Sequence, residues 1–175
     1  MTIQLSTIAI VGTGAMGRGI AQIAAQAGSQ VLLLDANPGA VETAKRALQE
    51  QWGKLVAKGR IDASQAAAWT DSLHPVRAVA DLSACDLVIE AIVERLDAKQ
   101  ALFSQLEAVV RRDTVLATNT SSLSVTAIGA GLMHPDRLVG FHFFNPVPLM
   151  KVVEVIGGLR TDNVHCTALA AYARQ

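Results

Sequence analysis

The sequence predicts an α/β protein built on a doubly wound, mostly parallel sheet with helices on both faces. Apolar runs of four or five residues alternate with longer segments of helical periodicity, as in repeated strand–helix–strand units. Of the 175 residues, 51% are hydrophobic and only 4% aromatic, so a core of Ala, Val, Leu and Ile is expected. At about 150 residues per domain, the length suits one domain.

The first half of the chain predicts three strands separated by helices. The helix after the first strand should end at Gly28. Asn37-Pro38 is expected to start the next one, because Asn caps helices and Pro fits the first helical position. The expected strands are Thr7–Val11, Val31–Leu34 and Leu73–Val76, and the expected helices are Ala15–Ala27, Asn37–Lys58 and Asp62–Trp69.

The second half continues the pattern and then adds strands. We expect strands at Leu87–Ala91, Thr114–Ala117, Arg137–Phe143 and Lys151–Ile156, and helices at Arg95–Val110 and Asn163–Ala173. The last two strands are joined by a proline-interrupted loop, Asn145–Met150. Helical spacing assigns the buried face of the helix at Arg95–Val110 to Leu96, Ala101, Leu102, Leu106 and Val109–Val110.

Charge and composition exclude several classes of protein. Fifteen Lys and Arg balance fifteen Asp and Glu, so a general nucleic-acid binder is not expected. No apolar run approaches the ~20 residues that cross a bilayer, and the first residues lack the basic start of a signal peptide. Cys85 and Cys166 form no C-x-x-C pair and are expected as small buried residues. We expect a cytoplasmic protein with no metal site and no membrane partner.

A glycine-rich turn is the first candidate site. Gly12-Thr13-Gly14-Ala15-Met16-Gly17 fits G-x-G-x-x-G between a strand and a helix, and Asp35 lies 35 − 17 = 18 residues further on, at the end of the next strand. Gly12 permits the tight turn, Gly14 allows close approach of a pyrophosphate, and Gly17 allows helix and strand to pack closely. The free amides and the helix dipole would hold the phosphates. This context predicts a Rossmann-type, dinucleotide-binding fold rather than an ordinary strand-to-helix turn.

Asp35 favours NAD over NADP. Its carboxylate can accept hydrogen bonds from the ribose hydroxyls and would repel a 2′-phosphate. No Arg or Lys follows it in Ala36–Gly39. NAD is therefore the expected cofactor.

A histidine and a glutamate near the end of the chain form the second candidate site. Phe141, Phe143 and Phe144 surround His142 in sequence, which suggests a pocket of low dielectric constant. Glu154 follows 12 residues later among apolar residues, and a charged side chain among buried valines needs a partner. If the proline-rich loop folds back, His142 and Glu154 would pair as a general base and its orienting acid. The alternative is a structural histidine with a surface glutamate.

Polar residues after two further strands are also candidates. Asn119–Ser124 and Glu94 follow strands at the edge where open α/β sheets bind ligands. Ser122 or Ser124 can instead cap the short helix that follows, and Glu94 can be a first-turn acid favoured by the helix dipole.

With these motifs assembled, the chain resembles the NAD-binding domain of the L-3-hydroxyacyl-CoA dehydrogenase family over essentially its whole length. The block His142–Pro146 with the later Glu154 is the most specific part. The other matching segments are Gly12–Ile20, Val88–Glu94, Asn119–Leu123 and Met150–Val155.

The resemblance implies NAD-dependent oxidation of (S)-3-hydroxyacyl-CoA to 3-oxoacyl-CoA in fatty-acid or aromatic-acid degradation. It implies that His142 is the general base, that Glu154 orients it and that Ser121 holds the substrate oxygen. Asn145 would help to place substrate and nicotinamide.

The resemblance also implies contacts around the cofactor and the CoA moiety. Glu94 and Lys99 would contact the nicotinamide side of the cofactor, together with Ser121 and Asn145. Lys54 and Lys58 fall where the family's basic residues meet the CoA phosphate, and the alternative for both is a solvated helix face.

The family's chains continue into a helical domain that closes over the acyl chain and forms a homodimer. We therefore expect residues 1–175 to be a cofactor domain that binds NAD and turns over acyl-CoA poorly. Two alternatives remain open: a dehydrogenase of a free hydroxy or sugar acid, and a non-catalytic NAD-binding module.

Overall fold

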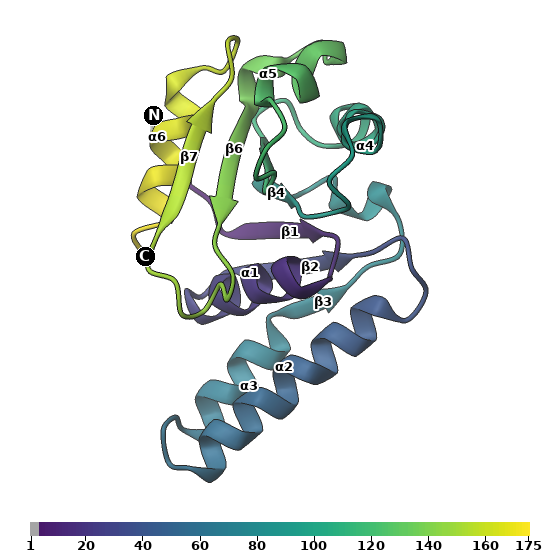
Figure 1. Ribbon diagram of the computed structural model, residues 1–175. Coiled ribbons are helices and arrows are strands. Elements are labelled where there is room, and N and C mark those ends of the chain that lie inside the picture. Colours follow the sequence, from purple (N-terminus) through teal and green to yellow (C-terminus); the bar gives the residue numbers. More distant parts are fainter. Residues whose placement is uncertain (1–3) are drawn as a thin grey trace.

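The computed structural model describes residues 4–175 and contains a seven-stranded sheet in the order β3-β2-β1-β4-β5-β6-β7 (Figure 1). β1 to β6 run parallel and β7 is antiparallel to β6. The order of the first six strands is that of doubly wound dinucleotide-binding sheets, so the predicted Rossmann-type fold is confirmed. The strands are β1 (Thr7–Val11), β2 (Gln30–Leu34), β3 (Leu73–Pro75), β4 (Leu87–Glu90), β5 (Val115–Thr118), β6 (Leu138–Phe143) and β7 (Val153–Gly157).

The described residues also form six α-helices and three short 3-10 helices, and all of them except α6, which follows β7, lie between strands. In Figure 1, α2 and α3 lie side by side as a hairpin that projects beyond β3. None of the helices in residues 4–175 combines the length and the apolar character needed to cross a membrane. The α-helices are α1 (Ala15–Gln26), α2 (Ala40–Ala57), α3 (Ala63–Asp71), α4 (Leu96–Val109), α5 (Val125–Ile128) and α6 (Asn163–Tyr172), and the 3-10 helices are Val79–Leu82, Gly129–Gly131 and Pro135–Arg137.

The core consists of two apolar layers, one on each face of the sheet. Alternate residues of β1 belong to different layers: Ile8 and Ile10 pack with α1 and α2, whereas Ala9 and Val11 pack with α4 and α5. All four are buried because helices cover both faces, which explains why the strands are continuous apolar runs in the sequence.

The predicted start of α2 at Asn37-Pro38 is wrong. The Asn37 amide donates to Asp35 Oδ1 at 2.9 Å, and the Asn37 carbonyl accepts from the Ala40 amide at 3.2 Å. These bonds hold Asn37 and Pro38 in a turn, and Gly39 caps the helix at φ 78°. Both backbone groups of Asn37 therefore form hydrogen bonds within the turn between β2 and α2, and the helix begins only after that turn.

The predicted buried face of α4 is also partly wrong. Leu96 and Ala101 are exposed, while Lys99, Phe103 and Leu106 are buried. The spacing of these three residues, i, i+4 and i+7, defines one helix face. The sequence did not reveal this face because it contains Lys99, and a lysine is normally expected in solvent.

Candidate active site

The glycine-rich turn between β1 and α1 has the shape needed to hold a pyrophosphate. Gly12 takes φ 94°, and a Cβ there would lie 2.6 Å from the Ala91 carbonyl oxygen at the end of β4. A Cβ on Gly17 would lie 1.8 Å from the Gly12 oxygen, so only glycine fits between strand and helix. Nothing lies within 4 Å of the equivalent point on Gly14, which caps α1. The turn is therefore tight at its base and open at the helix N-terminus, where phosphate oxygens bind.

Asp35 faces this turn from the end of β2. Its Oδ2 accepts from the Thr13 amide at 2.7 Å and the Thr13 hydroxyl at 2.8 Å. Partial burial would by itself raise the pKa of Asp35, but the Asn37 and Thr13 amides bring it below its ordinary value. A cavity of about 470 Å³ lies here, lined by Asp35, Thr13, Gly14 and Arg18 among others. The carboxylate is thus held in its ionised form where it lines this cavity.

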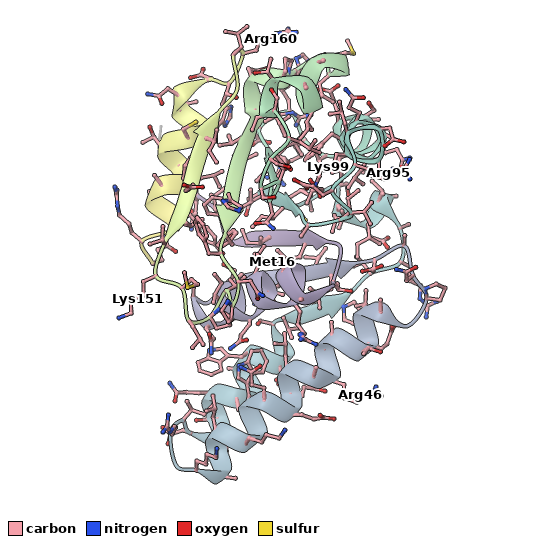
Figure 2. The ribbon with its side chains drawn as sticks, viewed as in Figure 1. Met16, Arg46, Arg95, Lys99, Lys151 and Arg160 are labelled. Carbon is pink, nitrogen blue, oxygen red and sulfur yellow. The ribbon has the colours of Figure 1, made fainter. Side chains whose placement is uncertain are left out.

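A second cavity, of about 380 Å³, lies beyond the carboxyl ends of β4, β5 and β6. This is the edge where an open α/β sheet binds its ligand, and the glycine-rich turn adjoins it through Met16, which is marked in Figure 2. The structure therefore brings together six of the residues that the sequence singled out. They are Met16, Glu94, Lys99, Ser121, His142 and Asn145.

His142 and Glu154 form a hydrogen-bonded pair across β6 and β7. The two residues are directly opposite in the antiparallel register, and His142 Nδ1 lies 2.8 Å from Glu154 Oε2. The side chain of His142 is 17% exposed and that of Glu154 is 54% exposed. In a neutral imidazole, a carboxylate on Nδ1 makes that nitrogen the donor, so that Nε2 is the nitrogen that can accept a proton. The predicted pairing is confirmed.

The prediction that three phenylalanines enclose His142 is wrong. Side chains alternate along a strand, so Phe141 and Phe143 lie on the opposite face of β6 and pack on each other with ring centroids 4.7 Å apart. Only the ring of Phe144 lies beside His142, with centroids 4.6 Å apart. β7 is likewise an edge strand of half-buried and exposed residues, not a buried one.

Glu94 ties the turn after β5 to the start of α4. Its Oε1 accepts from the Thr120 hydroxyl and from the amides of Ser121 (3.0 Å) and Ser122 (3.3 Å). Burial would raise the pKa of Glu94, but the Thr120 hydroxyl and the Lys99 ammonium bring it to about 2. Glu94 precedes α4, whose first-turn acid is Asp97, so the first-turn alternative is wrong.

A buried ion pair lies behind this cavity and was not predicted from the sequence. Glu90 and Lys99 are 0% and 1% exposed, and Lys99 Nζ lies 2.5 Å from Glu90 Oε1 and 3.2 Å from Glu94 Oε2. Figure 2 shows Lys99 on the side of α4 that faces the sheet, with Arg95 on the outer side. The Thr118 hydroxyl and the Ile92 amide also donate to Glu90, each at 2.7 Å. The signal in the sequence that could have indicated this pair is a carboxylate at the end of an apolar strand, Glu90, followed nine residues later by Lys99.

The remaining polar candidates have structural partners. Asn119 Oδ1 accepts from the Phe143 amide at 2.9 Å and so joins the turn after β5 to the end of β6. Ser124 Oγ accepts from the Ala127 amide at 3.3 Å, which confirms it as the cap of α5. Ser121 is exposed and lines the second cavity.

Lys54 and Lys58 are exposed on α2, and neither lines the two cavities described above. Their predicted role toward CoA therefore stays a prediction.

Of the cysteines, Cys85 is buried, and burial together with Asp86 raises the pKa of its thiol to about 11, while Cys166 is half-buried. Neither has the low pKa of a reactive thiol.

Comparison with known proteins identifies relatives of this fold and site. The family described as "3-hydroxyacyl-CoA dehydrogenase, NAD binding domain" matches residues 7–175. The chain is 46% identical over 161 residues to 3-hydroxyadipyl-CoA dehydrogenase of Escherichia coli K12, covering 92% of this chain and 34% of that protein. It is 41% identical over 157 residues to 3-hydroxybutyryl-CoA dehydrogenase of Clostridioides difficile, covering 90% of this chain and 56% of that protein.

Solved structures agree with this result. The crystal structure of 3-hydroxybutyryl-CoA dehydrogenase from Escherichia coli K12 superposes with a TM-score of 0.95 at 43% identity, covering 98% of this chain and 36% of that one. The chain thus spans between about a third and somewhat over half of the length of these relatives.

Proposed function

The chain belongs to the 3-hydroxyacyl-CoA dehydrogenase family, as its NAD-binding domain, and from this premise we propose that the protein oxidises (S)-3-hydroxyacyl-CoA to 3-oxoacyl-CoA. The observation that carries the proposal is the His142–Glu154 pair at the cavity beyond β4, β5 and β6. A protein that only binds NAD would not need a histidine paired with a carboxylate at this cavity, whereas a dehydrogenase needs such a histidine as its base.

His142 would act as the general base. Nε2 takes the proton of the 3-hydroxyl group, while Glu154 at Nδ1 keeps the ring oriented and stabilises the imidazolium that results. When bound, NAD would accept the hydride from the carbon atom that carries this hydroxyl group. The carbon–oxygen bond becomes a carbonyl, and one proton and one hydride have left the alcohol.

The other residues at the cavity would position the reactants. Ser121 is exposed at the cavity and can donate its hydroxyl to the substrate oxygen, and Asn145 lies across the same cavity on the loop after β6. The dinucleotide would be held by the glycine-rich turn and the residues beside it, with Glu94 and Lys99 on the nicotinamide side. The holding residues are Gly12, Gly14, Ala15, Met16, Gly17 and Asp35. We extend the proposal to CoA contacts at Lys54 and Lys58, a cytoplasmic location and a homodimer of the full-length protein.

The test is His142→Gln in the full-length protein. Glutamine keeps the approximate size and the hydrogen-bonding capacity but cannot take the proton, so kcat for acetoacetyl-CoA reduction by NADH should fall by about 10²–10⁴-fold. NAD affinity, measured by calorimetric titration, should stay within about twofold, since the phosphate and ribose contacts are untouched. Loss of rate together with loss of NAD binding would instead indicate disruption of the fold.

A matched substrate pair separates the alternatives. Oxidation of NADH by acetoacetyl-CoA but not by free acetoacetate supports a thioester substrate, and the reverse supports a dehydrogenase of free acids. An unchanged rate in His142→Gln contradicts the assignment of the base.

A further inference from the structure

The second cavity has an uneven charge distribution on its β4–α4 side. Glu94 and Lys99 line the cavity there, and Glu90 lies directly behind Lys99. Among the described residues that line this cavity, Lys99 is the only lysine or arginine. Two carboxylates therefore face one ammonium group, and this side of the cavity carries a net charge of −1.

The ammonium group of Lys99 is shared between the two carboxylates and lies nearer to the buried one. Lys99 Nζ lies 2.5 Å from Glu90 Oε1 but 3.2 Å from Glu94 Oε2. Glu90 also accepts from the Thr118 hydroxyl and the Ile92 amide, so its oxygens face donors in a site closed to water. Three donors therefore surround the Glu90 carboxylate. One ammonium group thus faces two carboxylates, and Glu94 is the carboxylate that reaches the cavity.

Glu94 is also fixed in position. Its Oε1 receives the Thr120 hydroxyl and the Ser121 and Ser122 amides, all of them donors that stabilise an anion. The geometry therefore places a permanent negative charge at a defined point of the cavity. Its partial exposure to solvent weakens the field but does not remove it.

The two forms of a nicotinamide cofactor differ in charge. The oxidised ring carries one positive charge and the reduced ring none. In the proposed reaction, the C–H bond gives its electron pair to the ring and the O–H bond gives its proton to His142 Nε2. A positive charge thus disappears on the ring and appears on the imidazole, beside Glu154.

We propose that Glu94, as the cavity-facing member of a Glu90–Lys99–Glu94 cluster with a net charge of −1, makes this cavity favour the oxidised over the reduced nicotinamide dinucleotide. The inference rests on the proposed function, because it requires the nicotinamide ring to enter this cavity. Glu90 acts through Lys99 and is a positioning residue.

The test compares the dissociation constants of NAD⁺ and NADH by calorimetric titration of the protein and of Glu94→Gln. The ratio Kd(NAD⁺)/Kd(NADH) should rise by about tenfold in Glu94→Gln, since only the oxidised form loses an attraction. A loosened turn at Ser121 would weaken both forms alike and leave the ratio unchanged. The ratio therefore separates charge from structure.

Two further variants complete the test. Glu94→Asp keeps the charge and should hold the ratio within about twofold of the parent, even where both affinities fall. Glu50→Gln removes a carboxylate from an exposed position on α2 and should not alter the ratio. An equal change of both affinities in Glu94→Gln overturns the inference and leaves the proposed function standing. A parent protein that binds neither dinucleotide overturns both.

Discussion

At the scale of single residues, we propose that Asp35 selects the dinucleotide at the cavity beside the glycine-rich turn. Thr13 and Asn37 hold both of its oxygens, so the carboxylate cannot swing away from a ligand without losing three hydrogen bonds. Arg18 lines the same cavity and supplies a positive charge that a 2′-phosphate could use. We therefore expect the choice between NAD and NADP to depend on the negative charge of Asp35.

Replacing Asp35 by Asn should narrow the preference for NAD over NADP by about tenfold or more. The amide removes the repulsion of a 2′-phosphate and leaves Arg18 in place. Titration of each variant with both cofactors measures the ratio, and Asp71→Asn, at the exposed end of α3, is the matched control. Comparable affinities of the parent protein for NAD and NADP would contradict the role of Asp35.

The sequence identified the residues with obvious chemistry but missed those whose role depends on a partner across the fold. His142 and Glu154 could be paired because one hairpin joins their strands. The Glu90–Lys99 pair could not, because it requires knowing which face of α4 turns toward β4. The error over the three phenylalanines was avoidable, since neighbouring residues of a strand point to opposite faces.

At the scale of elements, the packing of α1 on β1 depends on the absence of a side chain at Gly17. A Cβ there would lie 1.8 Å from the Gly12 oxygen, which would force the helix away from the strand or distort the turn. Gly53 is a useful contrast, because it lies within α2 with nothing within 4 Å of its Cβ position.

Gly17→Ala should therefore lower the free energy of unfolding by roughly 1–3 kcal/mol and weaken NAD binding. Gly53→Ala should raise it by about 0.5–1 kcal/mol, because alanine is the better helix former and meets no neighbour. Urea unfolding followed by circular dichroism measures both changes. Equal effects of the two substitutions would show that the close approach at Gly17 is not a constraint.

Element boundaries were predictable where one local signal dominated and unpredictable where two competed. Gly28 and Gly59 adopt positive φ just beyond the ends of α1 and α2, as expected of helix-terminating glycines. Asn37 instead follows Asp35, whose side chain captures its amide. The preference of Asn for the cap position is overridden here by the hydrogen bond that the Asn37 amide donates to Asp35, two residues upstream.

At the scale of the whole molecule, the fold was predictable because both faces of the sheet are covered. Strands buried on both sides must be short continuous apolar runs, and six parallel strands with helical crossovers leave few arrangements of the chain. The site follows from that topology, since the carboxyl ends of β1, β4, β5 and β6 meet at one edge. The two edge strands, β3 and the antiparallel β7, lack the strongly buried pattern of the strands between them.

The projecting α2–α3 hairpin raises the question of whether the molecule unfolds as one unit. Both tryptophans of the chain, Trp52 and Trp69, lie in this hairpin with ring centroids 5.6 Å apart. Trp52 is fully buried and belongs to the same apolar layer as Ile10 and Leu33 of the sheet. That shared layer makes separation of the hairpin from the sheet costly, because it would expose residues of both.

We therefore expect tryptophan fluorescence and far-ultraviolet circular dichroism to report one coincident urea transition. Fluorescence follows the hairpin and circular dichroism follows all of the secondary structure, so coincidence indicates two-state unfolding. Leu33→Ala, which opens the shared layer from the sheet side, should lower both midpoints together and cost about 2–5 kcal/mol. A fluorescence transition at lower urea than the circular dichroism transition would mean that the hairpin unfolds as a separate unit.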